Sequence, residues 1–295
     1  MDKFYLKTLL LCLFSFIGMA KASAYDIEVA NADGVTIYYN YTNNGTELEV
    51  TYNDNNYSYK YSGNVVIPQS VTYNSTIYNV TSIGLCAFLH CTDLTEVSIP
   101  DGVTSINASA FSNCGIISIN IPSSVSFIGK NAFNSCKSLV SITIPEGVTT
   151  ILGDGFSNCY NLKYVSIPNS LTSMGNYVFV HCLELTTVVA MIQEPFNISS
   201  NTFSQSVYES AILHVPQGTV AKYKMADGWK YFVNIVDDIP ADISNSVNID
   251  DVDDVYVYKI GDTGITMKKD DLKSLPKGIY ILRNSDGTVK KVLVK

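Results

Sequence analysis

The sequence predicts a β-rich solenoid, in which short coils stack so that equivalent strands of successive coils lie side by side. A phenylalanine that recurs at nearly constant spacing is the first observation, and its copies are Phe88, Phe111, Phe133, Phe156 and Phe179. Only the interval from Phe111 to Phe133 is shorter than the others, by a single residue. A cysteine follows each phenylalanine three positions later, and four of the five copies then reach an Ile-Pro pair. A unit this short cannot bury its own apolar side, whereas identical units can do so by stacking.

The first copy shows what each unit is expected to form. From Ala87 to Leu94 the apolar positions recur every third residue, which is typical of one or two turns of α- or 3₁₀-helix with one buried face. The alternation that follows Leu94 predicts a short strand, which Pro100 ends. Val103 to Ile106 is expected to form a second short extended segment. Equivalent strands would then lie parallel, about 4.8 Å apart.

The cysteines after the phenylalanines allow either a metal- or disulfide-bonded array or a structural ladder. Neighbouring Cα atoms would be close enough for a disulfide. Parallel side chains in a ladder point the same way, however, and five is an odd number. We therefore expect these residues to line the core beside the phenylalanines, at Cys91, Cys114, Cys136, Cys159 and Cys182. Cys86 lies out of this register and is expected to be a free thiol.

Both ends of the array carry altered sequence. Val65-Val66-Ile67-Pro68 and Leu213-His214-Val215-Pro216 read as partial repeats. Beyond the second of these, a helix is expected to place Tyr223, Trp229 and Phe232 over the last exposed layer. At the other end, the tyrosine-rich stretch 25–61 alternates around Asn43-Asn44-Gly45, which predicts a β-hairpin that caps the array.

The repeat pattern I-x-x-x-A-F-x-x-C-x-x-L-x-x-V-x-I-P resembles the BspA-like leucine-rich repeats of bacterial surface proteins, over roughly residues 60–236. This resemblance implies a leucine-rich-repeat solenoid, a right-handed superhelix of short parallel strands joined by short helices or 3₁₀ turns. It also implies adhesion to extracellular-matrix proteins and contact between bacteria, with different partners for different members.

After Pro240 the repeats stop. Residues 242–254 form an acidic linker, and short strand-like runs lead to the ending Lys290-Lys291-Val292-Leu293-Val294-Lys295. This tail resembles the C-terminal sorting domains of type IX secretion in Bacteroidetes, which implies transport across the outer membrane and, often, cleavage. From the residues alone, the segment predicts a small β domain on a linker.

The start of the chain has the layout of a secretory signal peptide. Lys3 and Lys7 precede an apolar run from Leu9 to Ile17, and small residues before Ala24 offer a cleavage site. That run is too short to span a membrane in the mature chain. We therefore predict a secreted or outer-surface protein in four parts, namely a signal peptide (1–24), an N-terminal β cap (25–61), a solenoid with its C-terminal cap (62–239), and a linker with a small sorting-like β domain (240–295).

Charge and motifs exclude several classes of function. Cleavage after Ala24 would leave 16 basic and 26 acidic residues, a net charge of −10, so we expect no nucleic-acid partner. The His90-Cys91 and His181-Cys182 pairs lie four repeats apart, about 19 Å, too far to share a metal ion. The run Asp250–Asp254 lacks the ligand spacing of a calcium loop. No phosphate-binding loop or nucleophile elbow is present, so the chain is expected to be neither an enzyme nor a cofactor-binding protein.

The strand face remains as the candidate binding surface. One row of side chains on it comprises Glu96, Ser118, Ser141, Tyr164 and Thr187, and the neighbouring row comprises Ser98, Asn120, Thr143, Ser166 and Val189. The leading hypothesis is an adhesive protein that binds a host-matrix or bacterial-surface protein along this face, with Tyr164 as the aromatic anchor. The alternative is a glycan-binding capture module, and a hydrolytic enzyme is the least favoured.

Overall fold

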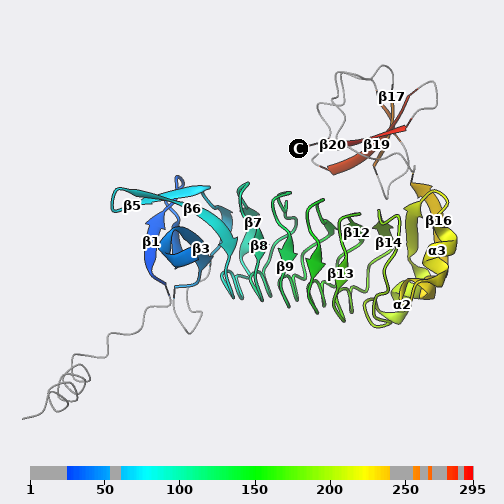
Figure 1. The fold of residues 1–295 in the computed structure, drawn as a ribbon, viewed down its shortest axis with the longest axis horizontal. Coiled ribbons are helices and arrows are strands. Elements are labelled where there is room, and N and C mark those ends of the chain that lie inside the picture. Colours follow the sequence, from blue (N-terminus) through cyan, green and yellow to red (C-terminus); the bar gives the residue numbers. More distant parts are fainter. Residues whose placement is uncertain are drawn as a thin grey trace, which may run out of the picture.

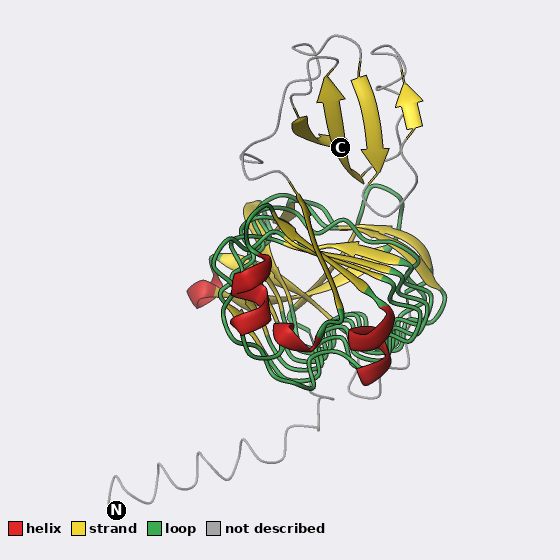
Figure 2. Ribbon diagram, turned by 90° about the vertical axis from the view of Figure 1, so that its right-hand side faces the viewer, coloured by secondary structure: helices red, strands yellow, loops and turns green. Residues whose placement is uncertain are grey.

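The computed structural model describes residues 25–53 and 61–239, together with the backbone of four short strands between residues 255 and 294. Residues 61–239 form a solenoid of stacked coils (Figure 1), and Figure 2, which looks along the stack, shows successive coils superimposed. The predicted β-solenoid is thus confirmed. The predicted signal peptide lies outside the described residues.

Two sheets run along the solenoid, and successive coils contribute strands to each of them. In the narrow sheet, the strands from β6 onward are parallel. They are β6 (Thr76–Ile83), β8 (Ser105–Ile106), β9 (Phe127–Ile128), β11 (Thr150–Ile151) and β13 (Ser173–Met174). The second extended segment predicted in each repeat is therefore present.

The broad sheet carries the strands that end near the Ile-Pro pairs. Its first part pairs β4 (Gly63–Val66) with β7 (Leu94–Ser98), and its second part contains β10 (Ser141–Thr143), β12 (Tyr164–Ile167), β14 (Thr187–Ala190), β15 (Ile212–Pro216) and β16 (Asn234–Ile239). All of these pairs are parallel. Both partial repeats predicted at the ends thus supply strands, β4 and β15.

The two parts of the broad sheet are separated by the copy that is one residue shorter than the rest. This copy contributes no strand to the sheet, and its Asn120 forms an isolated bridge with Ser98. Gly115 lies in this shorter copy, and a Cβ atom there would come 2.0 Å from the carbonyl oxygen of Thr92 in the preceding coil. Because this copy is one residue shorter, its backbone lies against that of the preceding coil at Gly115, and a side chain larger than that of glycine does not fit there.

The segment around each phenylalanine is a series of turns, so the helix expected from Ala87 to Leu94 is wrong. Every second N–H in this segment donates to the next coil, as that of Phe88 does to the carbonyl oxygen of Ala110 at 2.8 Å, and an α-helix needs those donors for itself. Cys86 lies two residues before Phe88 and has a φ of 57°, and His90 lies two residues after it and has a φ of 62°. Most residues at the equivalent positions of later coils are Asn, Asp or Ser, and Asn and Asp adopt such angles readily.

The core is a continuous stack of phenylalanine rings. Neighbouring ring centroids along the five predicted phenylalanines lie 4.9 to 5.4 Å apart with interplanar angles of 9° or less. Phe203 extends the stack by one ring at 5.3 Å, and Tyr61 begins it at 4.8 Å from Phe88. All five predicted phenylalanines are fully buried. The predicted ladder is confirmed, and it is longer than the regular repeat indicates.

The five cysteines are buried beside this stack and form no disulfide with one another, which contradicts the disulfide alternative. The thiol of Cys114 donates to the carbonyl oxygen of Phe88 at 2.9 Å, and that of Cys136 to Phe111 at 3.1 Å. Cys159 and Cys182 repeat the contact one and two coils further on. The cysteines therefore tie successive coils together as well as filling space.

Aromatic side chains cover the last ring of the stack. They come from the segment after α2 (Gln205–Ser210), which holds α3 (Val220–Met225) and the 3₁₀ turn η2 (Trp229–Tyr231), at the yellow end of Figure 1. Phe232 and Trp229 lie 5.1 and 6.2 Å from Phe203 between ring centroids, and Tyr223 lies 5.4 Å from Trp229. These are the three side chains that the sequence places over the last layer.

At the other end, β2 (Thr36–Thr42) and β3 (Glu47–Thr51) form the antiparallel hairpin predicted around Asn43-Asn44-Gly45, where the 3₁₀ turn η1 (Asn43–Gly45) lies. β1 (Ile27–Ala30) pairs with β2, β3 pairs in parallel with β6, and β5 (Ser70–Tyr73) pairs antiparallel with β6. The role of this unit as a cap stays a prediction.

The C-terminal strands form an antiparallel sheet of their own. It contains β17 (Val255–Lys259), β18 (Ile265–Met267), β19 (Gly278–Asn284) and β20 (Val289–Val294), in the order β18-β17-β19-β20. That these strands form a separate small β domain stays a prediction. Its sorting role stays a prediction, and the acidic run Asp250–Asp254 lies outside the described residues.

Shortening Phe133 to alanine should strongly destabilise the solenoid. Its ring contacts rings on both sides, so the substitution opens a cavity in the middle of the stack. We expect a loss of about 3–5 kcal/mol in the free energy of unfolding, measured by urea denaturation followed by circular dichroism. Leu183→Ala, at a side chain 59% exposed, is the control and should change it by less than about 0.5 kcal/mol. Equal effects of the two substitutions would contradict the stacked core.

Thiol labelling tests the cysteine ladder directly. In the native protein, the five ladder cysteines should react far more slowly than the half-buried Cys86. After unfolding without reductant, all six cysteines from Cys86 to Cys182 should react. Fewer than six labels, counted by mass spectrometry, would mean that a disulfide is present.

The buried thiols also predict a loss of stability at alkaline pH. Burial raises the pKa of Cys114 and of Cys136 well above the usual range. Because unfolded thiols ionise near pH ~8.5, the contribution of these two to stability is complete below that pH and falls as the pH rises above it. The urea midpoint should therefore drop between about pH 7 and 9.5, and less so in a Cys114→Val/Cys136→Val variant. An equal drop in both proteins would refute this origin.

Candidate interaction surface

The broad sheet brings the two predicted rows of side chains into register. Ser141 pairs with Tyr164 and Tyr164 with Thr187, while Thr143 pairs with Ser166 and Ser166 with Val189. Ser98 bridges Asn120 in the other part of the sheet. In the second part of the sheet the rows thus continue from coil to coil.

Exposure along these rows is uneven. Glu96, Ser98, Ser118, Asn120 and Ser141 are exposed, and Thr143 and Thr187 are half-buried. The polar surface of the two rows therefore lies mainly over the first three repeats.

Ser166 and Val189 correct the expectation that both rows face solvent along their whole length. Ser166 is 2% exposed and Val189 is fully buried. Val189 forms a small apolar cluster with Met191 and Ile239, and Tyr164 packs against that cluster. Burial raises the pKa of Tyr164 to about 12. Tyr164 is thus partly used for packing within the chain, which weakens its predicted role as the exposed anchor.

Two exposed apolar side chains beside the first row were not among the predicted contacts. Ile117 is 54% exposed and Val140 is 42% exposed, and the N–H of Val140 donates to the carbonyl oxygen of Ile117 at 3.2 Å, so they lie on neighbouring coils. The equivalent position holds threonine or lysine in the other regular coils, at Thr95, Lys163 and Thr186. This departure from a polar position was the signal in the sequence that could have identified them.

The histidines contact neighbouring coils rather than one another. Nδ1 of His90 lies 3.0 Å from Nδ2 of Asn113, and Nδ1 of His181 lies 3.0 Å from Oδ1 of Asn158. Nδ1 of His214 lies 2.9 Å from the carboxylate of Asp238. Over the described part of the chain, no group of three or more His, Cys, Asp or Glu side chains could hold a metal ion, and no helix could span a membrane.

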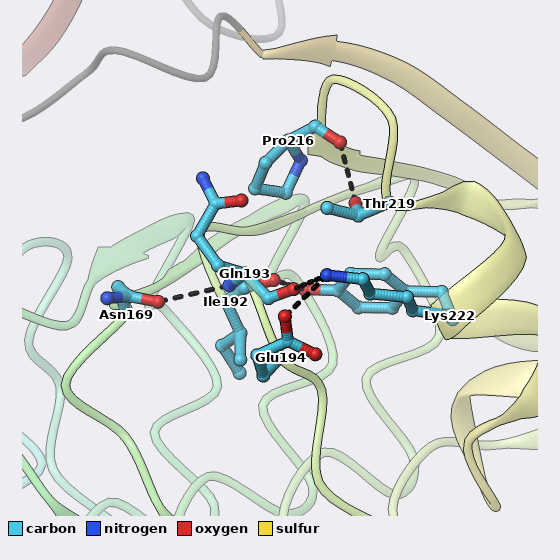
Figure 3. A network of polar contacts seen from close by, with 8 residues as sticks. Asn169, Ile192, Gln193, Glu194, Pro216, Thr219 and Lys222 are labelled. Carbon is cyan, nitrogen blue, oxygen red and sulfur yellow. Dashed lines mark hydrogen bonds and ion pairs between the residues drawn. The ribbon is translucent and has the colours of Figure 1, made fainter.

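A hollow of about 330 Å³ opens where the regular repeat ends, between the coil of Asn169 and the loop after β14. Leu171, Ile192 and Phe196 provide its apolar lining, and Asn169, Thr172, Gln193 and Glu194 its polar lining. Figure 3 shows Gln193 and Glu194 between Asn169 on one side and Lys222 of α3 on the other. The sequence does not predict this hollow, because it depends on where α3 packs.

Several contacts hold the loop that forms the hollow. The N–H of Gln193 donates to Oδ1 of Asn169 at 3.0 Å, and the Nζ of Lys222 contacts both the carbonyl oxygen of Gln193 and the carboxylate of Glu194. The buried hydroxyl of Tyr223 donates to the carbonyl oxygen of Ile192 at 2.8 Å, and the indole N–H of Trp229 to that of Phe196 at 2.9 Å. The loop is therefore fixed by side chains of the segment that closes the solenoid.

A match to a protein-family model agrees with the repeat fold. Residues 54–186 match the family model of the BspA type leucine rich repeat region, in six copies. A search of curated proteins finds no match.

Solved structures of bacterial leucine-rich-repeat proteins are similar to this chain. One from Bacteroides ovatus is 29% identical, with 65% of this chain and 55% of that protein covered and a TM-score of 0.47. One from Bacteroides capillosus is 27% identical, with 51% and 99% covered and a TM-score of 0.37. The pneumococcal vaccine antigen PcpA is 13% identical, with 66% and 65% covered and a TM-score of 0.40. This chain thus spans just over half of the length of the B. ovatus protein. Its residues 54–186 are similar in sequence to BspA-type leucine-rich repeats.

Proposed function

We propose that this chain is an exported interaction protein that binds a partner protein through the first three repeats of the broad sheet. The observation that carries the proposal is the pair of exposed apolar side chains, Ile117 and Val140, on adjacent coils beside the exposed Ser118 and Ser141. Apolar anchors surrounded by polar side chains are typical of protein interfaces.

The scaffold suits this role because its surface is rigid and extended. Each coil is hydrogen-bonded to the next and its phenylalanine is buried between neighbouring rings, so the exposed side chains keep fixed spacings. A partner can therefore contact several coils without first ordering them, which lowers the entropic cost of binding. Extended surfaces of stacked repeats are a usual form of binding surface.

The partner that best fits the repeat resemblance is an extracellular-matrix protein of a host or a surface protein of another bacterium. The acidic chain disfavours nucleic acid as a partner. The signal-peptide pattern before Ala24 supports export, and the tail after Pro240 supports passage to the outer surface.

Charged substitutions on the exposed row test this function. A Ser118→Glu/Ser141→Glu variant places two carboxylates beside Ile117 and Val140, so binding to an extracellular-matrix protein should weaken by at least about tenfold, measured by surface plasmon resonance at physiological salt. Ser126→Glu is the matched control, because Ser126 is an exposed serine next to the narrow sheet. Binding that survives the double substitution, or is lost equally in the control, would place the interface elsewhere.

Mass spectrometry of the surface-released protein tests export and processing. We expect a form that begins near residue 25 and lacks some or all of residues 240–295. A released form that retains both predicted segments would contradict the signal-peptide and sorting predictions.

A further inference from the structure

The hollow beside Gln193 presents polar groups that the protein does not use. The side-chain amide of Gln193 and the Nδ2 group of Asn169 make no hydrogen bond to the described residues, and of the two carboxylate oxygens of Glu194 only Oε1 contacts Lys222. In Figure 3 the Gln193 amide projects away from the contacts of its own backbone. The three residues that carry these groups line the same hollow.

An apolar surface lies beside these groups. Phe196 is partly exposed, and Leu171 and Ile192 are buried beneath the hollow. A hollow of about 330 Å³ is at the lower end of the size range of small-molecule sites. This volume admits one or two sugar rings, and it is too small for a folded partner.

The charge of the hollow favours a neutral ligand. The carboxylate of Glu194 is paired with the ammonium of Lys222, so the two charges offset each other at the opening. The whole chain carries a net charge of −8, which disfavours anionic ligands further. What remains for recognition is hydrogen bonding and contact with Phe196.

The hollow is also prepared before a ligand arrives. Asn169, Lys222, Tyr223 and Trp229 each hold the backbone of the loop that carries Gln193 and Phe196. A ligand therefore need not order this loop, and the entropic cost of binding is reduced accordingly.

We infer that this hollow is a binding subsite for one or two sugar units of a neutral glycan. The vicinal hydroxyl groups of a pyranose ring both donate and accept hydrogen bonds, which suits Gln193, Asn169 and the free oxygen of Glu194. The C–H face of the same ring packs against the aromatic side chain of Phe196. The subsite is separate from the protein-binding surface proposed at Ile117 and Val140.

Isothermal titration of the full chain with neutral sugars tests the inference. The probes are glucose, galactose, mannose, N-acetylglucosamine and the β-1,4- and α-1,4-linked disaccharides of glucose. We expect saturable binding of at least one probe. Gln193→Ala should weaken it by about tenfold, since it removes hydrogen bonds to the sugar and leaves the backbone contacts of the loop in place. Phe196→Leu should also weaken it, because the leucine keeps the apolar packing but removes the aromatic face.

Two control variants distinguish binding in the hollow from nonspecific binding elsewhere on the chain. Gln69→Ala, at an exposed glutamine near the other end of the solenoid, should bind the sugar like the wild type, and so should Ser118→Glu/Ser141→Glu. Thermal unfolding by circular dichroism checks that each variant is folded. If Gln193→Ala does not fold, Glu194→Gln, which keeps the shape of the side chain, replaces it as the variant that alters the hollow.

No binding of any probe up to about 10 mM, or equal binding by the hollow variants and Gln69→Ala, would overturn the inference. Binding of a peptide in the hollow without any sugar binding would overturn it as well.

Discussion

The contact of each coil with the next is the constraint on which the rest of this structure depends. A single coil has too little interior to bury its own phenylalanine, so the ring is buried only when rings from neighbouring coils lie against it. The backbone obeys the same constraint, since every second N–H around the phenylalanine donates to the following coil. The cysteine thiols add a third contact, to the phenylalanine carbonyl of the preceding coil. Ring packing and hydrogen bonding therefore both join successive coils along the axis of the solenoid.

A stack of this kind needs different sequence at its two ends. Phe203 has no further coil to cover it, and Trp229 and Phe232 pack on it instead. Their segment also reaches back through Lys222 and Tyr223 to the loop after β14. The closing segment thus does two things, because it buries the last ring and shapes the hollow beside Gln193.

The two proposed surfaces arise from different departures from the repeat. Ile117 and Val140 replace polar residues at one position of two adjacent coils, so the regular scaffold displays an irregular pair of apolar side chains. The hollow arises where the backbone itself leaves the repeat, after the fifth copy loses its Ile-Pro pair. The residues that follow the repeat pattern form the scaffold, and both proposed binding surfaces lie where the chain departs from that pattern.

The sequence by itself determined the period, the inward ladders of phenylalanine and cysteine, the two extended segments of each repeat and the register of the side-chain rows. These features follow from the local spacing of residues, which recurs in each repeat. Only the tertiary structure decided that the segment around each phenylalanine forms turns instead of a helix, because its N–H groups find acceptors in another coil. It also decided that Val189 is buried in a cluster with Ile239 of the closing segment, and that Lys222 of α3 meets Glu194 of the loop after β14. Such contacts join parts of the chain that share no periodicity, so no local pattern encodes them.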